Sequence, residues 1–398
     1  MVDITITLEH RFKRTPDGKV WTQTMFANSF WQRYLAVFDH VYVAARVEEI
    51  EELPADWMRA DGNGVSFLSI PYYLGLKQYL AKSHDITSAA RQIVATSQAF
   101  ILRTPSHIAA HFWPILHATG HPYGVEAVGD AYDCYAPGAV RHPLRPLIRR
   151  VFLRQMRQQC WHANAVSYVS LRALQPRFPT APEHFSIGCS DIELDETWFV
   201  DEARLITGPQ LPATLVTVGS LGQMVKAIDI LLTAVSICLR RGVNIHLNLI
   251  GDGKHRQSLE LLARQLGIEN AVTFFGQLPS GASIRHQLDA ADLFILPSRT
   301  EGLPRALIEA MARALPCIGS AVGGITELLS PVDCIHPGNP EKLASKIIEV
   351  LHDGKRMAAM SHRNLEHAKD YLNDKLIGKR LAFLRMLSDR TEQWLMTH

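Results

Sequence analysis

The stretch from residue 293 to residue 320 restricts the fold of this chain more than any other. It opens with an apolar run at 293–296 that is typical of a buried strand, passes through a polar loop and enters a helical pattern with Pro304 in its first turn. The first N–H groups of such a helix lack internal partners and carry partial positive charge, so the preceding loop suits phosphate oxygens. Glu301 in the loop and Glu309 inside the helix frame this site, and carboxylates placed there suit the hydroxyl groups of sugars and ribose.

Strand and helix patterns alternate along the rest of the chain. Such alternation favours parallel sheets covered by helices, whose active sites lie beyond the carboxyl ends of the strands. A chain of 398 residues, 47% of them hydrophobic, exceeds the usual size of one core, so two domains are expected. We place the first domain at 1–190, a polar linker at 191–212, the second domain at 213–369 and a helical segment at 370–398. Strands are expected at 4–8, 40–45, 65–70, 99–102, 123–128, 165–170, 184–187, 214–219, 245–250, 272–278 and 293–296.

The run that begins at Glu301 and contains Glu309 resembles the donor-site signature of family-4 glycosyltransferases, in which two glutamates are separated by seven residues. The resemblance implies an α/β protein of the GT-B fold, with two Rossmann-like parallel-sheet domains facing across a cleft and a carboxyl-terminal helix that crosses back to the first domain. It also implies that Glu301 contacts hydroxyls of the donor sugar and that Glu309 contacts the ribose of the sugar nucleotide. On the residues alone, Arg305, Glu309 and Arg313 are four apart and also fit a solvated charge ladder on one helix face.

Other residues of the second domain extend this resemblance to a whole donor site. Relatives supply an arginine and a lysine to the donor diphosphate after the first strand of this domain; Lys226 matches the lysine, whereas Ser220 stands at the arginine position. The turn with Gly251 and Gly253 resembles the family's G-x-G turn facing the donor. The remaining donor-binding residues implied by the signature are Gly302, Leu303 and Pro304.

The resemblance implies a retaining transfer in which the leaving phosphate assists deprotonation of the acceptor hydroxyl. Negative charge grows on that phosphate, and we expect Lys226 and the N–H groups of Gly302 and Leu303 to stabilise it. The chain has no D-x-D motif to hold a divalent ion on the diphosphate. Metal-independent catalysis is therefore expected, with no metal site and no cofactor beyond the nucleotide diphosphate sugar as co-substrate.

The first domain is expected to bind the acceptor, and its resemblance to the family is diffuse. Many relatives have a histidine near the strand at 123–128; here Asp130 is the acidic candidate for the reacting centre, although a buried Asp130 that only shapes its loop fits the sequence equally well. The loop at 10–21 is basic and aromatic where the family often has a glycine-rich loop, and it fits either an acceptor contact or a surface hairpin. Further candidates near the reacting centre are Glu126, Asp133, His111, His117 and His121.

A basic segment without acidic residues extends from 134 to 182 and contains eight arginines. Residues 144–160 show an amphipathic helical pattern, and the region from Arg141 to Arg157 suits a membrane surface or a phosphate-bearing lipid acceptor. An ordinary helix with a solvated basic face is the alternative. Six scattered cysteines, the lack of a signal-like amino terminus and the lack of any membrane-length apolar window indicate a cytoplasmic protein, peripheral at the inner membrane face if this helix binds lipid.

These features together predict a retaining glycosyltransferase that uses a nucleotide sugar donor and a glycan or lipid-linked acceptor, with no nucleic-acid partner. Assembly of cell-surface polysaccharide or lipid-linked glycan is the favoured setting, and glycosylation of a small natural product is the next. Two other classes fit the same architecture: a sugar-nucleotide epimerase and a non-catalytic scaffold that binds sugar nucleotides. The sequence does not identify the base, the sugar, the acceptor, the linkage or the oligomeric state.

Overall fold

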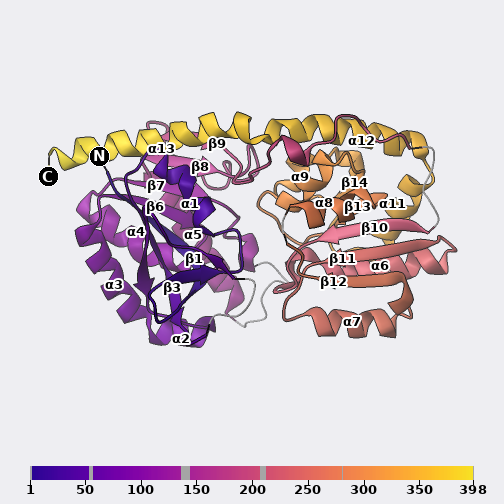
Figure 1. Cartoon of the computed structure of the whole chain (residues 1–398), viewed down its shortest axis with the longest axis horizontal. Helices are drawn as coiled ribbons and strands as arrows, with labels where there is room; N and C mark the ends of the chain where they lie inside the picture. Colours follow the sequence, from indigo (N-terminus) through magenta and orange to yellow (C-terminus); the bar gives the residue numbers. More distant parts are fainter. Residues whose placement is uncertain (1, 53–56, 136–143, 207–211, 280, 398) are drawn as a thin grey trace.

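The computed structural model describes residues 2–52, 57–135, 144–206, 212–279 and 281–397. It has two domains, each built around a mainly or wholly parallel sheet, and a band of helix that runs along one side of both (Figure 1). The two parallel-sheet domains expected from the alternating pattern are confirmed.

The sheet of the first domain has parallel strands in the order β5-β3-β1-β6-β7-β8-β9, and two short strands, β2 and β4, extend it in antiparallel pairing. Helices cover both faces of this sheet, so the side chains of its central strands are buried on both sides. The strands are β1 (Ile4–Arg14), β2 (Val20–Thr22), β3 (Val41–Glu49), β4 (Met58–Arg59), β5 (Val65–Ile70), β6 (Ala99–Thr104), β7 (Tyr123–Ala127), β8 (Ala165–Tyr168) and β9 (Phe185–Gly188). The helices are α1 (Asn28–Leu35), α2 (Gly75–Ala81), α3 (Ser83–Thr96), α4 (His107–Thr119) and α5 (Arg145–His162).

The first strand is longer than its apolar run predicts. Beyond an irregularity between Leu8 and Arg11, it continues beside β3 to Arg14, and its last residues, Lys13 and Arg14, also pair with β2. The basic loop expected at 10–21 is therefore mostly a β-hairpin, whose turn is closed by the bond from the Thr15 N–H to the Lys19 carbonyl, 3.0 Å. This outcome matches the surface-hairpin alternative.

The sheet of the second domain is wholly parallel, in the order β12-β11-β10-β13-β14-β15. The first strand, β10, therefore lies beside the fourth, β13. The loops that follow these two strands come together at the carboxyl ends of the strands. The strands are β10 (Ala213–Val218), β11 (Ile245–Ile250), β12 (Val272–Gly276), β13 (Leu293–Leu296), β14 (Cys317–Ser320) and β15 (Cys334–Ile335). The helices are α6 (Ile228–Arg240), α7 (Arg256–Gln265), α8 (Ala282–Asp289), α9 (Arg305–Ala312), α10 (Ile325–Leu328) and α11 (Pro340–Leu351).

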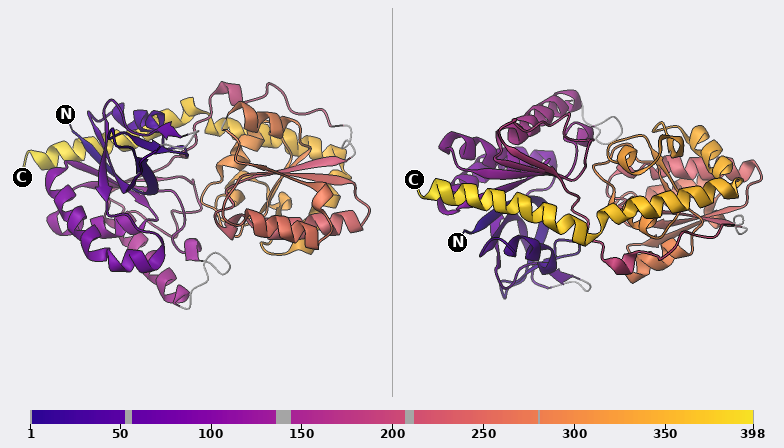
Figure 2. Two further views of the ribbon diagram at one scale, coloured as in Figure 1. Left: turned by 60° about the horizontal axis from the view of Figure 1, so that its bottom comes forward. Right: turned by 90° about the horizontal axis from the view of Figure 1, so that it is seen from above.

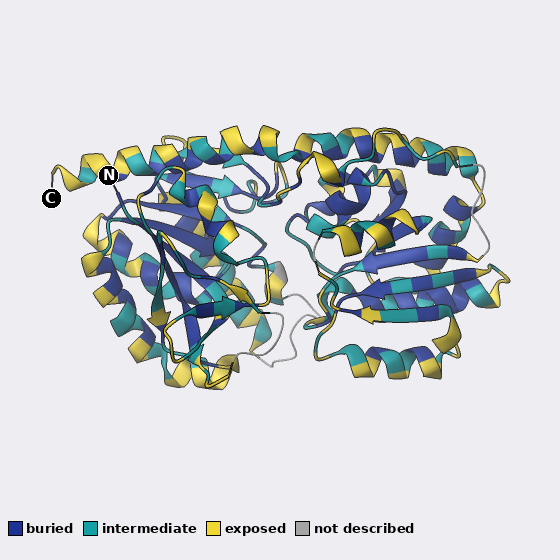
Figure 3. Ribbon diagram, viewed as in Figure 1, coloured by how far each residue is buried: buried dark blue, intermediate teal, exposed yellow. Residues whose placement is uncertain are grey.

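The chain ends in two helices that join the domains. α12 (Gly354–Ala368) packs against α9 in the second domain, and α13 (Asn373–Leu395) packs against β8 and β9 in the first, so the pair crosses between the domains with a bend (Figure 2). Phe383, Leu384 and Leu387 of α13 are buried in the core of the first sheet, and the outer side of the helix is exposed (Figure 3). The expected return of the carboxyl-terminal helix to the first domain is confirmed. None of the described helices is both long and apolar enough to cross a bilayer.

Candidate functional site

An ion pair joins the loops after β10 and β13, which meet at the carboxyl ends of the strands of the second sheet. Lys226 ends the short turn after β10, and its Nζ lies 2.6 Å from Oε1 of Glu301, which lies in the loop between β13 and α9. The hydroxyl of Ser298, a fully buried residue, donates to the same Glu301 oxygen, also at 2.6 Å. The structure thus brings together two residues that the sequence predicts to be catalytic, and the Glu301 carboxylate holds the Lys226 ammonium ion.

The amino end of α9 offers free main-chain donors beside this pair. Pro304 precedes the helix, and no side chain caps it. In the described part of the chain, the N–H groups of Gly302 and Leu303 make no hydrogen bond, whereas the Gly302 carbonyl accepts from Gly324 N–H at 2.7 Å. Unpaired N–H groups at a helix start attract anions. Gly302 and Leu303 therefore offer the donors that the predicted phosphate site needs, and the binding of phosphate there stays a prediction.

Glu309 lies one and a half turns inside α9 and is nearly inaccessible to solvent, with 9% of its surface exposed. Among the described residues its carboxylate has no hydrogen-bond partner and no ion pair within 4 Å. Burial raises the pKa of Glu309, and the positive charge of Arg305 opposes this effect only in part. The carboxylate oxygens of Glu309 keep some access to the surface, so a ligand that supplies hydroxyl donors can pair with them.

The two glycines of the turn after β11 are required by packing within the domain. A Cβ on Gly251 would lie 1.9 Å from the Gly219 carbonyl oxygen, and one on Gly253 would lie 2.2 Å from the Gly222 nitrogen. Both have a positive φ, 138° and 154°. The backbone of this turn therefore lies close to the loop at 219–222, which leads to Lys226, and its facing the donor stays a prediction.

Ser220 brings no positive charge to this loop. It is exposed, and its hydroxyl accepts from Gly222 N–H at 3.1 Å, so it shapes the turn. Gly219 instead lies under the Lys226 side chain, whose Cγ would be 3.1 Å from a Cβ at that position. The Lys226 side chain therefore packs against the backbone of the loop at 219–222.

Asp130 follows β7, on the side of the first domain that faces α9. Its carboxylate forms an ion pair with Arg177 and accepts from Tyr132 N–H at 2.8 Å. Its neighbour Gly129 lies close to Gly302 of the second domain. These contacts hold the loop at 128–132 in shape, and they engage both oxygens of the Asp130 carboxylate.

The other candidates of the first domain are distributed among structural contacts. Glu126 accepts from the Tyr34 hydroxyl at 2.8 Å and pairs with Arg103, which also bonds Asp191 at 2.6 Å. His117 and His121 lie at and just beyond the carboxyl-terminal end of α4, where His117 stacks on Trp113 and His121 contacts the Ser97 carbonyl. The Asp133 side chain and Arg141 lie outside what the structure describes.

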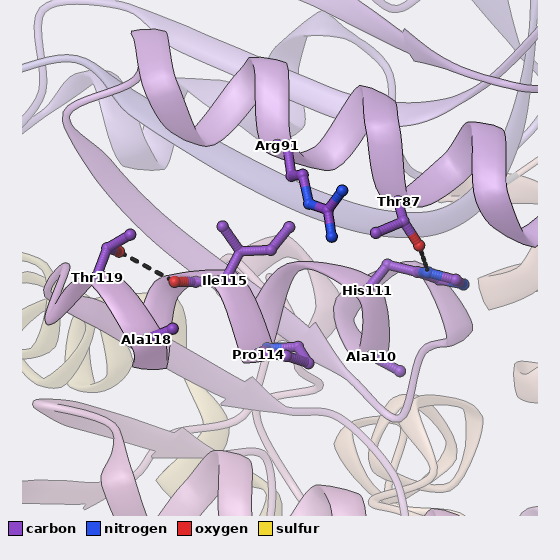
Figure 4. A pocket seen from close by; sticks show the side chains of 8 residues that line it. All are labelled: Thr87, Arg91, Ala110, His111, Pro114, Ile115, Ala118 and Thr119. Carbon is purple, nitrogen blue, oxygen red and sulfur yellow. Dashed lines mark hydrogen bonds between the residues drawn. The ribbon is translucent and has the colours of Figure 1, made fainter.

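His111 lines a groove of about 350 Å³ between α3 and α4, together with Thr87 and Arg91 (Figure 4). Its ring nitrogens bond the Thr87 hydroxyl at 2.8 Å and the Tyr79 hydroxyl at 3.0 Å. Burial lowers the pKa of His111, although the nearby Glu9 carboxylate raises it in part. Both nitrogens are therefore engaged within the first domain, and the groove is formed without residues of the second.

Sequence reasoning missed a second polar cluster, which surrounds Glu9 on β1. One carboxylate oxygen of Glu9 accepts from the Tyr73 hydroxyl at 2.6 Å and pairs with Arg46 at 3.0 Å; the other accepts from the Ser106 hydroxyl and the Ile108 N–H of α4. Burial raises the pKa of Glu9, but Arg46 and these hydrogen bonds outweigh it, so the net pKa is lowered. The position of Glu9 directly after the apolar run at 4–8 was an available signal.

No group of three or more histidine, cysteine, aspartate or glutamate side chains with metal-binding geometry occurs among the residues that the structure describes. Lys226 and the amino end of α9 place positive charge at the site.

Comparisons with known proteins agree with this geometry. The family model described as glycosyl transferases group 1 matches residues 206–367, which contain Lys226, Glu301 and Glu309. Protein CapJ of Staphylococcus aureus is 26% identical over 81% of this chain and 80% of its own length. The putative colanic acid biosynthesis glycosyltransferase WcaL of Salmonella typhimurium is 27% identical over half of each chain.

The fold is also similar to that of a solved structure over nearly its full length. HepE of Anabaena, in complex with UDP and glucose, aligns with a TM-score of 0.65 at 15% identity, covering 96% of this chain and 98% of its own. At this identity the likeness is one of fold.

Proposed function

Because the chain is a group 1 glycosyltransferase with the GT-B fold, we propose that it transfers a sugar from a nucleoside diphosphate sugar to an acceptor hydroxyl with retention of configuration. The observation that carries the proposal is the position of Lys226 beside the free N–H groups at the start of α9, with the unsatisfied carboxylate of Glu309 in the same helix. These groups match the parts of a sugar nucleotide: a diphosphate needs positive charge, and a ribose needs hydrogen-bond acceptors.

The proposed reaction breaks the bond between the sugar C1 and the β-phosphate oxygen, and forms a bond from C1 to the acceptor oxygen on the same face. The acceptor proton passes to the leaving phosphate. Lys226 and the N–H groups of Gly302 and Leu303 stabilise the charge that grows on that phosphate. When the donor binds, the Lys226 ammonium leaves the Glu301 carboxylate and pairs with the phosphate instead. Glu301 can then accept hydrogen bonds from the sugar hydroxyls. No metal ion is required, because these groups supply the positive charge.

We assign the transfer to the assembly of a cell-surface polysaccharide or a lipid-linked glycan. The name of the relative WcaL refers to colanic acid biosynthesis, and HepE binds UDP and glucose in its crystal, which supports a sugar nucleotide as donor. The acceptor would enter from the first domain, whose loop at 128–132 contacts the loop before α9.

A lipid-linked acceptor is supported by the surface of α5. Leu147 and Val151 of this helix are 61% and 46% exposed, and arginines flank them. Leu76 and Leu80 of α2 are exposed as well, and a chain of ring contacts links the two helices, since His107 touches Tyr79 of α2 and Phe152 of α5. Apolar side chains among arginines suit an anionic membrane surface.

Calorimetric titration of UDP, GDP, ADP and dTDP into the protein tests the donor site. We expect one nucleotide to bind, and Lys226→Ala and Glu309→Ala to weaken it. Lys346→Ala is the matched control, because Lys346 also has 20% of its side chain exposed and pairs with a glutamate, yet lies on α11. With an identified donor and acceptor, Lys226→Ala should cost about 2–4 kcal/mol of transition-state stabilisation. Failure of all four nucleotides to bind would overturn the proposal in favour of a fold with another use.

A further inference from the structure

Arg299 ties the loop that carries Glu301 to the turn that carries Lys226. Its guanidinium bonds both oxygens of Asp229, at 2.9 and 2.7 Å, and the Met224 carbonyl at 2.6 Å. Its own N–H donates to the Val225 carbonyl at 2.7 Å. Asp229 lies in the first turn of α6, directly after the Lys226 turn. One residue therefore makes four hydrogen bonds to the segment on either side of Lys226.

The Lys226 turn needs such support because its backbone is strained. Ala227, the next residue, has a φ of +53°. Residues with a Cβ adopt this left-handed backbone conformation only at a cost in free energy. Strained residues persist where the surroundings over-determine them, and they concentrate at functional sites. Here the surroundings are the Arg299 bonds to the carbonyls of Met224 and Val225, which precede Lys226 in the turn.

We propose that Arg299 is a positioning residue for Lys226: its four bonds to Met224, Val225 and Asp229 hold the turn so that the lysine can bind the donor diphosphate. The inference rests on the proposed function. The charge of Arg299 is matched by the bidentate Asp229 carboxylate, so it contributes geometry, whereas Lys226 contributes the charge. A lysine in its place keeps the positive charge but cannot make the planar pair of bonds to Asp229 together with the carbonyl bond.

The test compares Arg299→Lys with a matched substitution elsewhere in the domain. Arg356 on α12 has nearly the same side-chain exposure, 19% against 20%, and also bonds an aspartate and a main-chain carbonyl, those of Asp333 and Val332. Asp333 precedes β15 and so lies at the amino end of a strand, away from Lys226. Arg356→Lys therefore controls for the general loss of an arginine clamp in this domain.

The measurement is the calorimetric affinity of each variant for a nucleoside diphosphate that the wild type binds and for the corresponding monophosphate. We expect Arg299→Lys to weaken the diphosphate at least about fivefold and the monophosphate less than about twofold, and Arg356→Lys to leave both within about twofold. A merely structural role for Arg299 would weaken both nucleotides together. In a Lys226→Ala background, Arg299→Lys should have no further effect on the diphosphate.

Three results would overturn the inference: unchanged diphosphate affinity in Arg299→Lys, an equal loss for both nucleotides, or effects of Lys226→Ala and Arg299→Lys that add. Each of these requires that the wild type bind a nucleoside diphosphate. A wild type that binds none refutes the proposed function instead, so the two failures are distinguishable.

Discussion

A Cβ atom on Gly302 would lie 2.7 Å from the carbonyl oxygen of Val128, so the loop before α9 in the second domain touches the first domain directly. The same apolar cluster includes Leu303 and Ala127, one from each side of this contact. The start of α9 is therefore in contact with the loop after β7 in this arrangement of the domains.

Gly302→Ala should hold the two domains farther apart. Gly302 has no positive φ, so the alanine is strained by its close contacts with Val128 and Gly129 and not by its backbone conformation. We expect a larger radius of gyration in small-angle X-ray scattering and weaker binding of the sugar nucleotide, with little change in the unfolding midpoint of each domain. Gly378→Ala on α13 is the control, because nothing lies within 4 Å of its Cβ position; it should leave the shape unchanged and add about 0.5–1 kcal/mol of helix stability. An unchanged radius for Gly302→Ala would contradict this account.

Glu309 should make the protein less stable as the pH rises. Because burial raises its folded pKa above the ordinary glutamate value, the protonated form is favoured in the folded state. The associated stability is complete below the unfolded pKa and is lost as the pH rises through the folded one. Glu309→Gln should therefore raise the melting temperature at neutral pH and leave it nearly unchanged at acid pH. Equal effects of this substitution at both pH values would refute the assignment.

Glu327 should restrain the relative motion of the domains. Its carboxylate accepts from the N–H groups of Leu171 and Arg172 at 2.7 and 2.8 Å, and from that of Ala173, all in the first domain. Glu327→Ala removes this contact and should increase proteolytic cleavage around 171–173 without bound ligand. Glu341→Gln, at an exposed surface pair with Arg241, is the control and should not change the cleavage pattern. Cleavage of Glu327→Ala at the wild-type rate would show that the contact does not restrain the domains.

Membrane contact through α5 should depend on its exposed apolar side chains. We expect the double variant Leu147→Glu and Val151→Glu to lose binding to vesicles that contain phosphatidylglycerol, measured by flotation, because it places negative charge at the proposed contact. Leu261→Glu on α7 is the control, since Leu261 is 54% exposed but lies on the second domain. If the wild type does not float with these vesicles, or the double variant floats as well as the wild type, the lipid surface proposal for this helix is wrong.

The second domain was the more predictable part because its information is local. The apolar run at 293–296, Pro304 and the spacing of Leu307, Ile308 and Met311 specify a strand, a loop and a helix within about twenty residues. The helix begins one residue after Pro304, which is its cap. The separate helix α12 was not predicted. Only two residues lie between the end of α11 at Leu351 and the start of α12 at Gly354, so no loop pattern separates the two helices.

Contacts between distant segments were not predictable from spacing. Asp130 pairs with Arg177, 47 residues away, and Arg299 pairs with Asp229, 70 residues away. No local pattern marks such partners, although Asp130 was recognised as a polar residue near a strand end and Lys226 through the family resemblance. The roles of the site residues remain predictions that the experiments above test.

The crossing of α13 has a consequence for the order in which the chain folds during synthesis. Phe383 and Leu387 cover Gly124 in the inner strand β7, where a Cβ would lie 3.1 Å from each of them. The first domain emerges from the ribosome early, yet this face of its sheet stays uncovered until the final helix has been made. A chaperone that binds exposed apolar surface would therefore find its target on the first domain throughout translation of the second.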